Sequence, residues 1–281
     1  MARRITCVSS CIVTAPWPEA FSRHICVLIN PANTALSGPL RGSFPRGGPV
    51  PPPGSVSSST SETSRSLTAR LSTSLRSWWG SDGTPPPDAD LLYPAQAVDG
   101  LVHAEGLGKL KAALAAHPIL ERRDETGEHI RCHVGDAVLT AGRFNALPFD
   151  AIVHTVPPFW PRRAAGTQSE ATAQWAADLR SCYDASFRLA IEFAASCDRS
   201  SSAEGLAIAT PILGSGARGA PFAPAVRVLA EAAAQAFSET RDTTAQRAGS
   251  LSLRVVLDPG SLGSQQAVAE AAMSDAMGKR V

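Results

Sequence analysis

The sequence has no run of about 18 or more apolar residues, so we do not expect a membrane-spanning helix. It also has almost no charge imbalance. The formal net charge of +1 gives neither a basic field that would favour nucleic acid nor an acidic field that would oppose it. The hydrophobic fraction of 44% over 281 residues is ordinary for a globular protein and allows one large domain or two small ones.

The cysteines lack the spacing of a metal site. None of the six belongs to a C-x-x-C pair, and they are spread over the whole chain. Disulfide frameworks belong to short secreted chains, which this is not. We therefore expect reduced thiols, no zinc site and a cytosolic type of compartment.

The N-terminus allows two interpretations. Residues 1–14 carry Arg3 and Arg4 before a mildly apolar stretch and contain no acidic residue, which fits an organelle-targeting segment. Residues 5–13 are also rich in β-branched side chains, which predicts a first strand. We favour the strand. The compartment stays open between cytosol, nucleus and an organelle.

Residues 39–94 differ in composition from the rest of the chain. They contain a proline-rich stretch at 49–53, a serine-rich stretch at 55–59 and three prolines at 85–87. Such a segment has too few periodic apolar residues to offset the entropy of ordering it, so we expect a disordered insertion. Trp78 and Trp79 are the exception and could pack on the body. We expect a single domain over residues 1–281, interrupted by this insertion.

Apolar strands alternate with helical patterns on both sides of residues 39–94. Continuous apolar runs predict buried strands at 25–29, 151–156, 206–210 and 251–257. Apolar side chains three or four positions apart predict a helix over 170–197, and alanine-rich stretches predict helices over 225–237 and 267–277. This alternation predicts a layered α/β domain with a largely parallel sheet.

Three loops at strand ends or helix starts are the places where such a sheet would bind a ligand. Loop 30–38 has two asparagines and a glycine that can present amides in a turn. Loop 211–221 has three glycines within six residues, whose N–H groups can cradle a phosphate at the start of a helix. Residues 97–103 contain Asp99 and open a helix with Leu107, Leu110 and Leu114. Each loop taken singly is explained by a tight connection or a helix cap.

Taken together, the order of these blocks resembles the macro domain family, and within it the MacroD-type hydrolases. The likeness covers most of the chain outside residues 39–94. ICVLINPAN at 25–33 is similar to the family's strand and NAAN-type turn, and AVDGLVH at 97–103 is similar to its GVDGAIH. Three further blocks follow in the family's order, at 135–158, 179–190 and 211–221. The resemblance implies a three-layer α/β/α fold around a central mixed, largely parallel sheet.

The resemblance also implies roles for individual residues. Asn33 matches the asparagine that orients the distal ribose, and Asp99 matches the carboxylate that activates water in the hydrolytic branch. The segment beside that ribose corresponds to Ala97 and Val98. The backbone amides that wrap the diphosphate correspond to Gly214, Ser215, Gly216, Ala217 and Arg218. This scheme requires neither a metal nor a nucleotide cofactor.

Four departures from the family pattern bear on activity. Residues 10–13 lack the aspartate that grips the adenine amine, and a charged hydrogen bond of that kind contributes about 1.5–3 kcal/mol. Arg218 replaces an aromatic residue and either pairs with phosphate or faces solvent. Ala97 replaces a glycine, and the insertion enters the loop that places Asp99. We expect binding to survive these changes better than turnover.

The leading hypothesis is therefore an ADP-ribose-binding hydrolase of mono-ADP-ribosyl or O-acetyl-ADP-ribose ester linkages, with Asp99 and Asn33 as catalytic residues. Its partners would be ADP-ribose, its derivatives and ADP-ribosylated proteins. One alternative is a reader that binds without turnover, and another is a degenerate member that binds nothing tightly. His103 and His154 match family histidines, and we interpret both as hydrogen-bonded structural residues rather than catalysts.

Overall fold

The computed structural model describes residues 4–9, 12, 24–38, 98–122, 129–161, 167–197, 205–216, 218–242, 250–257 and 263–278. The expected insertion over 39–94, with Trp78 and Trp79, lies outside the described residues. Ala97 and Ala217 lie outside them as well. The expectations for these positions therefore stay predictions.

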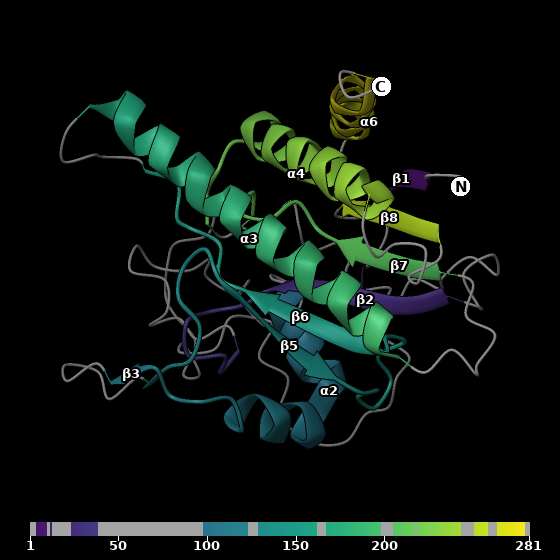
Figure 1. Ribbon diagram of the computed structural model, residues 1–281. Coiled ribbons are helices and arrows are strands. Elements are labelled where there is room, and N and C mark those ends of the chain that lie inside the picture. Colours follow the sequence, from purple (N-terminus) through teal and green to yellow (C-terminus); the bar gives the residue numbers. More distant parts are fainter. Residues whose placement is uncertain are drawn as a thin grey trace.

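Six strands form one sheet, in the order β1-β8-β7-β2-β6-β5 (Figure 1). Neighbouring strands run parallel, except that β5 is antiparallel to β6. This is the mixed, largely parallel sheet that the family resemblance implied. The strands are β1 (Arg4–Ser9), β2 (His24–Pro31), β5 (Ala137–Ala141), β6 (Ala151–Thr155), β7 (Gly205–Thr210) and β8 (Ser250–Leu257). A separate antiparallel pair is formed by β3 (Glu121–Arg122) and β4 (His129–Ile130).

Helices cover both faces of the sheet, which makes three layers (Figure 1). On one face lie α3 (Gln168–Ser196), α4 (Phe222–Asp242) and α6 (Gly263–Gly278), and on the other lies α2 (Val98–Ala115). Successive side chains of a strand point to opposite faces. Val27 and Ile29 of β2 therefore pack in the core with α3 and α4, while Leu28 between them packs in the core with α2. The continuous apolar runs in the sequence follow from this two-sided burial.

Two local expectations need correction. The first strand ends at Ser9 rather than at residue 13, and Ile12 lies in a turn, where it is buried. The helix α2 bends at Leu107, whose φ of 50° and ψ of −150° are not helical. Leu107 is therefore exposed, while Leu110 and Leu114 are buried as their spacing suggests. Within the described part of the chain, no helix has both the length and the apolar character needed to cross a bilayer.

Candidate functional site

The central strand β2 lies between β7 and β6 and is parallel to both, so the three strands end at one edge of the sheet. The loops that follow them, residues 32–38, 157–161 and 211–221, leave from that edge. The helix α2 begins beside it, because Asp99 in its first turn contacts Asn30 at the end of β2. This is the strand-end position at which parallel α/β sheets bind ligands.

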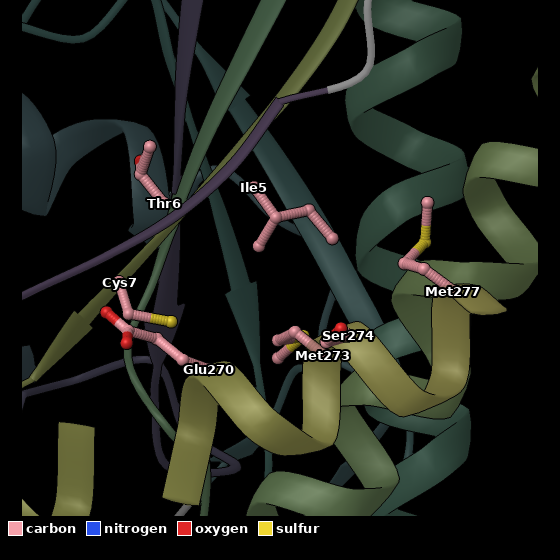
Figure 2. A pocket seen from close by; sticks show the side chains of 7 residues that line it. All are labelled: Ile5, Thr6, Cys7, Glu270, Met273, Ser274 and Met277. Atoms are coloured by element: carbon pink, nitrogen blue, oxygen red, sulfur yellow. The ribbon is translucent and has the colours of Figure 1, made fainter. Parts of the chain in front are cut away.

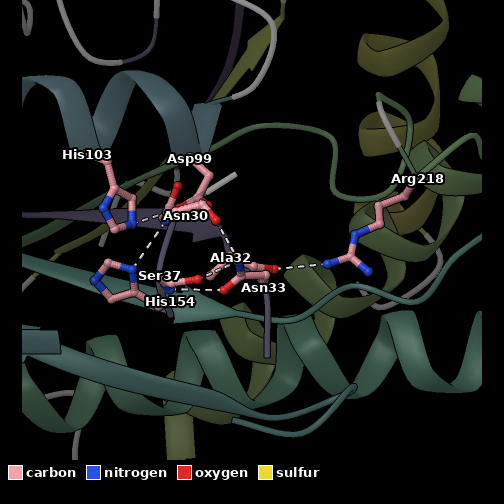
Figure 3. A network of polar contacts seen from close by, with 9 residues as sticks. Asn30, Ala32, Asn33, Ser37, Asp99, His103, His154 and Arg218 are labelled. Atoms are coloured by element: carbon pink, nitrogen blue, oxygen red, sulfur yellow. Dashed lines mark hydrogen bonds and ion pairs between the residues drawn. The ribbon is translucent and has the colours of Figure 1, made fainter. Parts of the chain in front are cut away.

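Asp99 is held at this edge by a buried asparagine (Figure 3). The Asn30 side-chain nitrogen donates a hydrogen bond of 2.7 Å to Oδ1 of Asp99, and both residues are buried. Asp99 lies within the first turn of α2 and is not its N-cap, so the simple capping explanation of this residue is wrong. Its carboxylate is fixed by tertiary contacts instead.

Two histidines complete this polar network (Figure 3). Nδ1 of His154 lies 3.2 Å from the Asn30 amide nitrogen, and Nε2 of His103 lies 3.5 Å from Oδ1 of Asp99. An amide nitrogen has two hydrogens, so Asn30 can donate to Asp99 and to His154 at the same time. His154 then accepts at Nδ1 and carries its proton on Nε2. The expected structural role of His154 fits this geometry.

The environment of Asp99 raises its proton affinity. Burial raises the pKa of the Asp99 carboxyl, while His103, the Asn30 hydrogen bond and Arg218 oppose that shift. The pKa of His154 is lowered to about 3, because burial and the nearby His103 and His117 disfavour its charged form. A buried carboxylate with a raised pKa is suited to accept a proton from water.

Asn33 closes a turn directly after β2. Its side-chain nitrogen donates to Oγ of Ser37 at 3.1 Å and to the carbonyl oxygen of Gly38, while its Oδ1 accepts from the Ser37 backbone N–H at 3.1 Å. Gly38 has a φ of 92°, and a Cβ there would lie 3.3 Å from Cγ of His103. This close approach connects the Asn33 turn to α2, the helix that carries Asp99.

The glycine-rich loop after β7 has the backbone of an anion site. Gly214 has a φ of 80°, and the loop is closed by hydrogen bonds from the Ala220 N–H to the Gly214 carbonyl (2.9 Å) and from the Gly219 N–H to the Gly216 carbonyl (2.8 Å). The backbone N–H groups of Gly214 and Gly216 donate to no acceptor among the described residues. The N-terminus of α4 follows at Phe222, where N–H groups and the helix dipole favour an anion.

Tyr183 of α3 holds the glycine-rich loop through two hydrogen bonds. Its hydroxyl oxygen accepts from the Leu213 N–H at 2.8 Å, and the hydroxyl donates to the Pro211 carbonyl at 3.4 Å. Burial raises the pKa of Tyr183, so the hydroxyl keeps the proton that it donates. Sequence analysis placed Tyr183 in a matching block but gave it no role. The sequence signal that could have indicated this role is a tyrosine, which has a polar hydroxyl, on the apolar face of α3.

Arg218 joins two of the loops (Figure 3). Its Nη2 donates to the carbonyl oxygen of Ala32 at 3.0 Å, and its Cζ lies 4.3 Å from the centre of the Phe159 ring. Burial lowers the pKa of Arg218 to about 10, although Cys182 and Asp99 oppose that shift, so the side chain is a cation at neutral pH. Of the two alternatives for this residue, the one in which it merely faces solvent is wrong.

A protein-family model matches the part of the chain that contains most of these residues. Residues 96–229, which include Asp99 and the glycine-rich loop, match the family model of the macro domain. This part of the chain belongs to the macro domain family. No curated protein matches the chain.

Solved macrodomains share the fold. The Oceanobacillus iheyensis macrodomain with MES bound is 18% identical, with a TM-score of 0.52, and the match covers 98% of this chain and 93% of that one. A mutant of the same macrodomain with ADPR is 16% identical, with a TM-score of 0.50 and coverage of 96% and 92%. The same macrodomain with ADP is 16% identical, with a TM-score of 0.50 and coverage of 98% and 92%.

Most of the macro domain residues expected in the site do lie at this edge. Asp99 is connected to Asn33 through the contact between His103 and Gly38, and Arg218 is connected to the Asn33 turn through Ala32. The remaining described members are Val98, Gly214, Ser215 and Gly216. The roles of all these residues in ligand binding remain predictions. Sequence analysis gave no role to Asn30 or Phe159, which hold Asp99 and Arg218 in place.

A separate groove lies at the other end of the sheet (Figure 2). It has a volume of about 450 Å³ and runs between β1 and α6, so β8 and β7 separate it from β2. It does not belong to the network around Asp99. Within the described residues, no three His, Cys, Asp or Glu side chains come close enough together to hold a metal ion. The groove is lined by Ile5, Thr6, Cys7, Glu270, Met273, Ser274 and Met277.

Proposed function

We propose that this macro domain binds ADP-ribose at the edge formed by β2, β6 and β7, and that it hydrolyses mono-ADP-ribosyl or O-acetyl-ADP-ribose ester linkages. The observation that carries the proposal is the buried Asp99 carboxylate, which Asn30 orients at 2.7 Å beside the strand-end loops. The solved macrodomain of O. iheyensis, which has the same fold, holds ADPR and ADP.

In this proposal the loop after β7 binds the diphosphate. The N–H groups of Gly214 and Gly216 would donate to phosphate oxygens, and Ser215 and the start of α4 would add further donors. The distal ribose would then lie between Asn33 and the start of α2, at Val98 and Asp99. This placement uses backbone amides for affinity and side chains for orientation.

The hydrolytic step needs only a base and water. Asp99 would take a proton from a water molecule. At the same time, the water oxygen forms a bond to the anomeric carbon of the ribose or to the ester carbonyl carbon. The bond from that carbon to the leaving oxygen breaks, and Asp99 returns the proton to the leaving oxygen. The raised pKa of Asp99 favours this role, because a general base works best when its pKa lies near the working pH.

A reader without turnover is the second candidate, and one observation favours it. Oδ1 of Asp99 is contacted by both Asn30 and His103, so part of its capacity to accept a proton is already engaged. In this case the protein would hold ADP-ribose or an ADP-ribosylated protein and release it unchanged.

The test combines binding with turnover. Calorimetric titration of the full chain with ADP-ribose should show saturable binding, and incubation with an ADP-ribosylated substrate should release ADP-ribose. Asp99→Ala should abolish release while retaining binding. The control is Asp184→Asn, which changes an exposed carboxylate paired with Arg180 on α3 and should have no effect. Release that persists in Asp99→Ala contradicts the mechanism, and binding without release in the unmutated protein identifies the reader.

A further inference from the structure

The guanidinium of Arg218 bridges two loops that are far apart in the sequence. The hydrogen bond from Nη2 to the Ala32 carbonyl spans 186 residues and connects the loop after β7 to the Asn33 turn after β2. The base of the side chain is also fixed, because the Trp160 N–H donates to the Arg218 carbonyl at 3.0 Å. Arg218 is therefore held at its backbone by Trp160 and at its guanidinium by Ala32, and Figure 3 shows the second of these contacts.

The two contacts of the guanidinium use different parts of it. The central carbon Cζ lies over the Phe159 ring, 4.3 Å from its centre, while the hydrogen bond to Ala32 uses an N–H of Nη2. A guanidinium can stack on a ring and donate from its edge at the same time. It can therefore exchange the carbonyl of Ala32 for another acceptor while it stays on Phe159.

A phosphate is a better acceptor for this edge than a peptide carbonyl. A phosphate carries the negative charge that a peptide carbonyl lacks, and a guanidinium can donate two parallel hydrogen bonds to one phosphate. Arg218 lies two positions after Gly216, and the N–H groups of Gly214 and Gly216 have no acceptor among the described residues. A ligand with two linked phosphates would meet both the amides and the cation.

We infer that Arg218 determines the specificity of this site for a diphosphate. Its guanidinium would exchange the hydrogen bond to the Ala32 carbonyl for hydrogen bonds to a ligand phosphate. This inference rests on the proposed ADP-ribose binding. Its ligand class is ADP-ribose and other diphosphate esters, in preference to nucleosides and monophosphates.

The experiment measures calorimetric affinities for ADP-ribose, adenosine and inorganic pyrophosphate on the full chain. The variants are Arg218→Gln, which removes the charge, and Arg218→Lys, which keeps the charge but loses the planar fork. The matched control is Arg188→Gln, an exposed arginine of α3 that pairs with Glu192 at 3.3 Å. Titrations at low and high salt test the charge contribution, because salt weakens exposed ionic contacts.

We expect Arg218→Gln to weaken ADP-ribose and pyrophosphate binding by about 10- to 100-fold, the range for a lost charged hydrogen bond. Adenosine affinity should change by less than about twofold, and the salt dependence of ADP-ribose binding should decrease. The affinities of Arg218→Lys for ADP-ribose and pyrophosphate should lie between those of Arg218→Gln and the unmutated protein. The affinities of Arg188→Gln should equal those of the unmutated protein. Equal losses for adenosine and ADP-ribose would mean that Arg218 only supports the loops, and this would overturn the inference.

The outcomes separate the inference from the proposed function. If the unmutated protein binds ADP-ribose and Arg218→Gln binds it equally well, the function stands and the inference is wrong. If pyrophosphate binds through Arg218 but ADP-ribose does not bind, the diphosphate specificity stands and the proposed function is wrong. If the unmutated protein binds neither ligand, both are wrong.

Discussion

Asn30 at the end of β2 and Asp99 in the first turn of α2 are joined by a buried hydrogen bond of 2.7 Å, although 69 positions separate them in the sequence. The bond fixes the carboxylate relative to the strand-end loops rather than relative to its own helix. Displacements of about 1 Å can reduce the rate of a reaction by roughly a hundredfold.

Asp99→Asn should stabilise the protein at neutral pH. Burial raises the pKa of Asp99, so the folded state disfavours the ionised form that exists above this pKa. Removing the charge should raise the free energy of unfolding by about 1.4 kcal/mol for each unit of pKa shift. The gain should disappear below about pH 4, where the carboxyl is protonated in both states. Thermal melts of both proteins at neutral and acidic pH measure this, and a lower melting temperature for the variant at neutral pH contradicts it.

His154→Asn should flatten the pH dependence of stability. The pKa of His154 is lowered to about 3, so the unfolded state takes up a proton near pH 6.5 that the folded state does not. His154 therefore contributes stability that is present above pH 6.5 and is lost as the pH falls. Between pH 6.5 and 5 the loss should be about 1.5–2 kcal/mol larger for the unmutated protein than for the variant. Urea unfolding across this range checks it, and parallel curves would show that His154 titrates normally.

Gly214→Ala and Gly216→Ala should separate stability from binding. At Gly214 a Cβ would meet only ordinary contacts of 3.8 Å or more, but the φ of 80° costs about 1–2 kcal/mol for other residues. At Gly216 a Cβ would meet nothing within 4 Å, so we expect unchanged stability. Gly216→Ala should nevertheless weaken ADP-ribose binding about tenfold, because the backbone at this position must approach the diphosphate closely. Melting curves and calorimetry measure the two effects. Unchanged affinity in Gly216→Ala would show that phosphate does not lie on this backbone.

Tyr183→Phe should loosen the glycine-rich loop. The change leaves the buried Leu213 N–H without its 2.8 Å acceptor, and an unsatisfied buried donor costs about 1–3 kcal/mol. Hydrogen exchange at the Leu213 amide should accelerate, while amides in β2 should exchange as before after correction for global stability. Equal protection of Leu213 in both proteins would mean that the hydroxyl does not hold the loop.

The sequence predicted the central strands well because burial on both faces leaves a continuous apolar run. β2 and β7 carry such runs, and each was predicted to within two residues at either end. β5 lies at the edge of the sheet and is mostly half-buried, so its pattern is mixed and no strand was predicted there. The end of β1 was also misplaced, since β-branched residues continue past Ser9 into the turn at Ile12.

The position of individual candidate residues at the strand-end edge was predictable, but their pairings were not. Asn33, Asp99 and the glycines of the loop after β7 stand in recognisable local patterns. The bonds from Asn30 to Asp99 and from Arg218 to Ala32 join residues that are 69 and 186 positions apart, and no local pattern encodes such contacts. For the same reason the sequence left two alternatives for Arg218, and the contact with Ala32 excludes only the one in which it faces solvent.

The contact between Gly38 and the His103 ring has a consequence for residues 39–97. The described chain ends at Gly38 and resumes at Val98, and this contact places the two ends together. A connection whose ends are already joined by the fold can change in length at little cost, since doubling a loop costs only about 0.6 kcal/mol. A change in the length of this segment should therefore cost little stability, whereas a side chain at Gly38 would have to displace the histidine ring that fills the adjacent space.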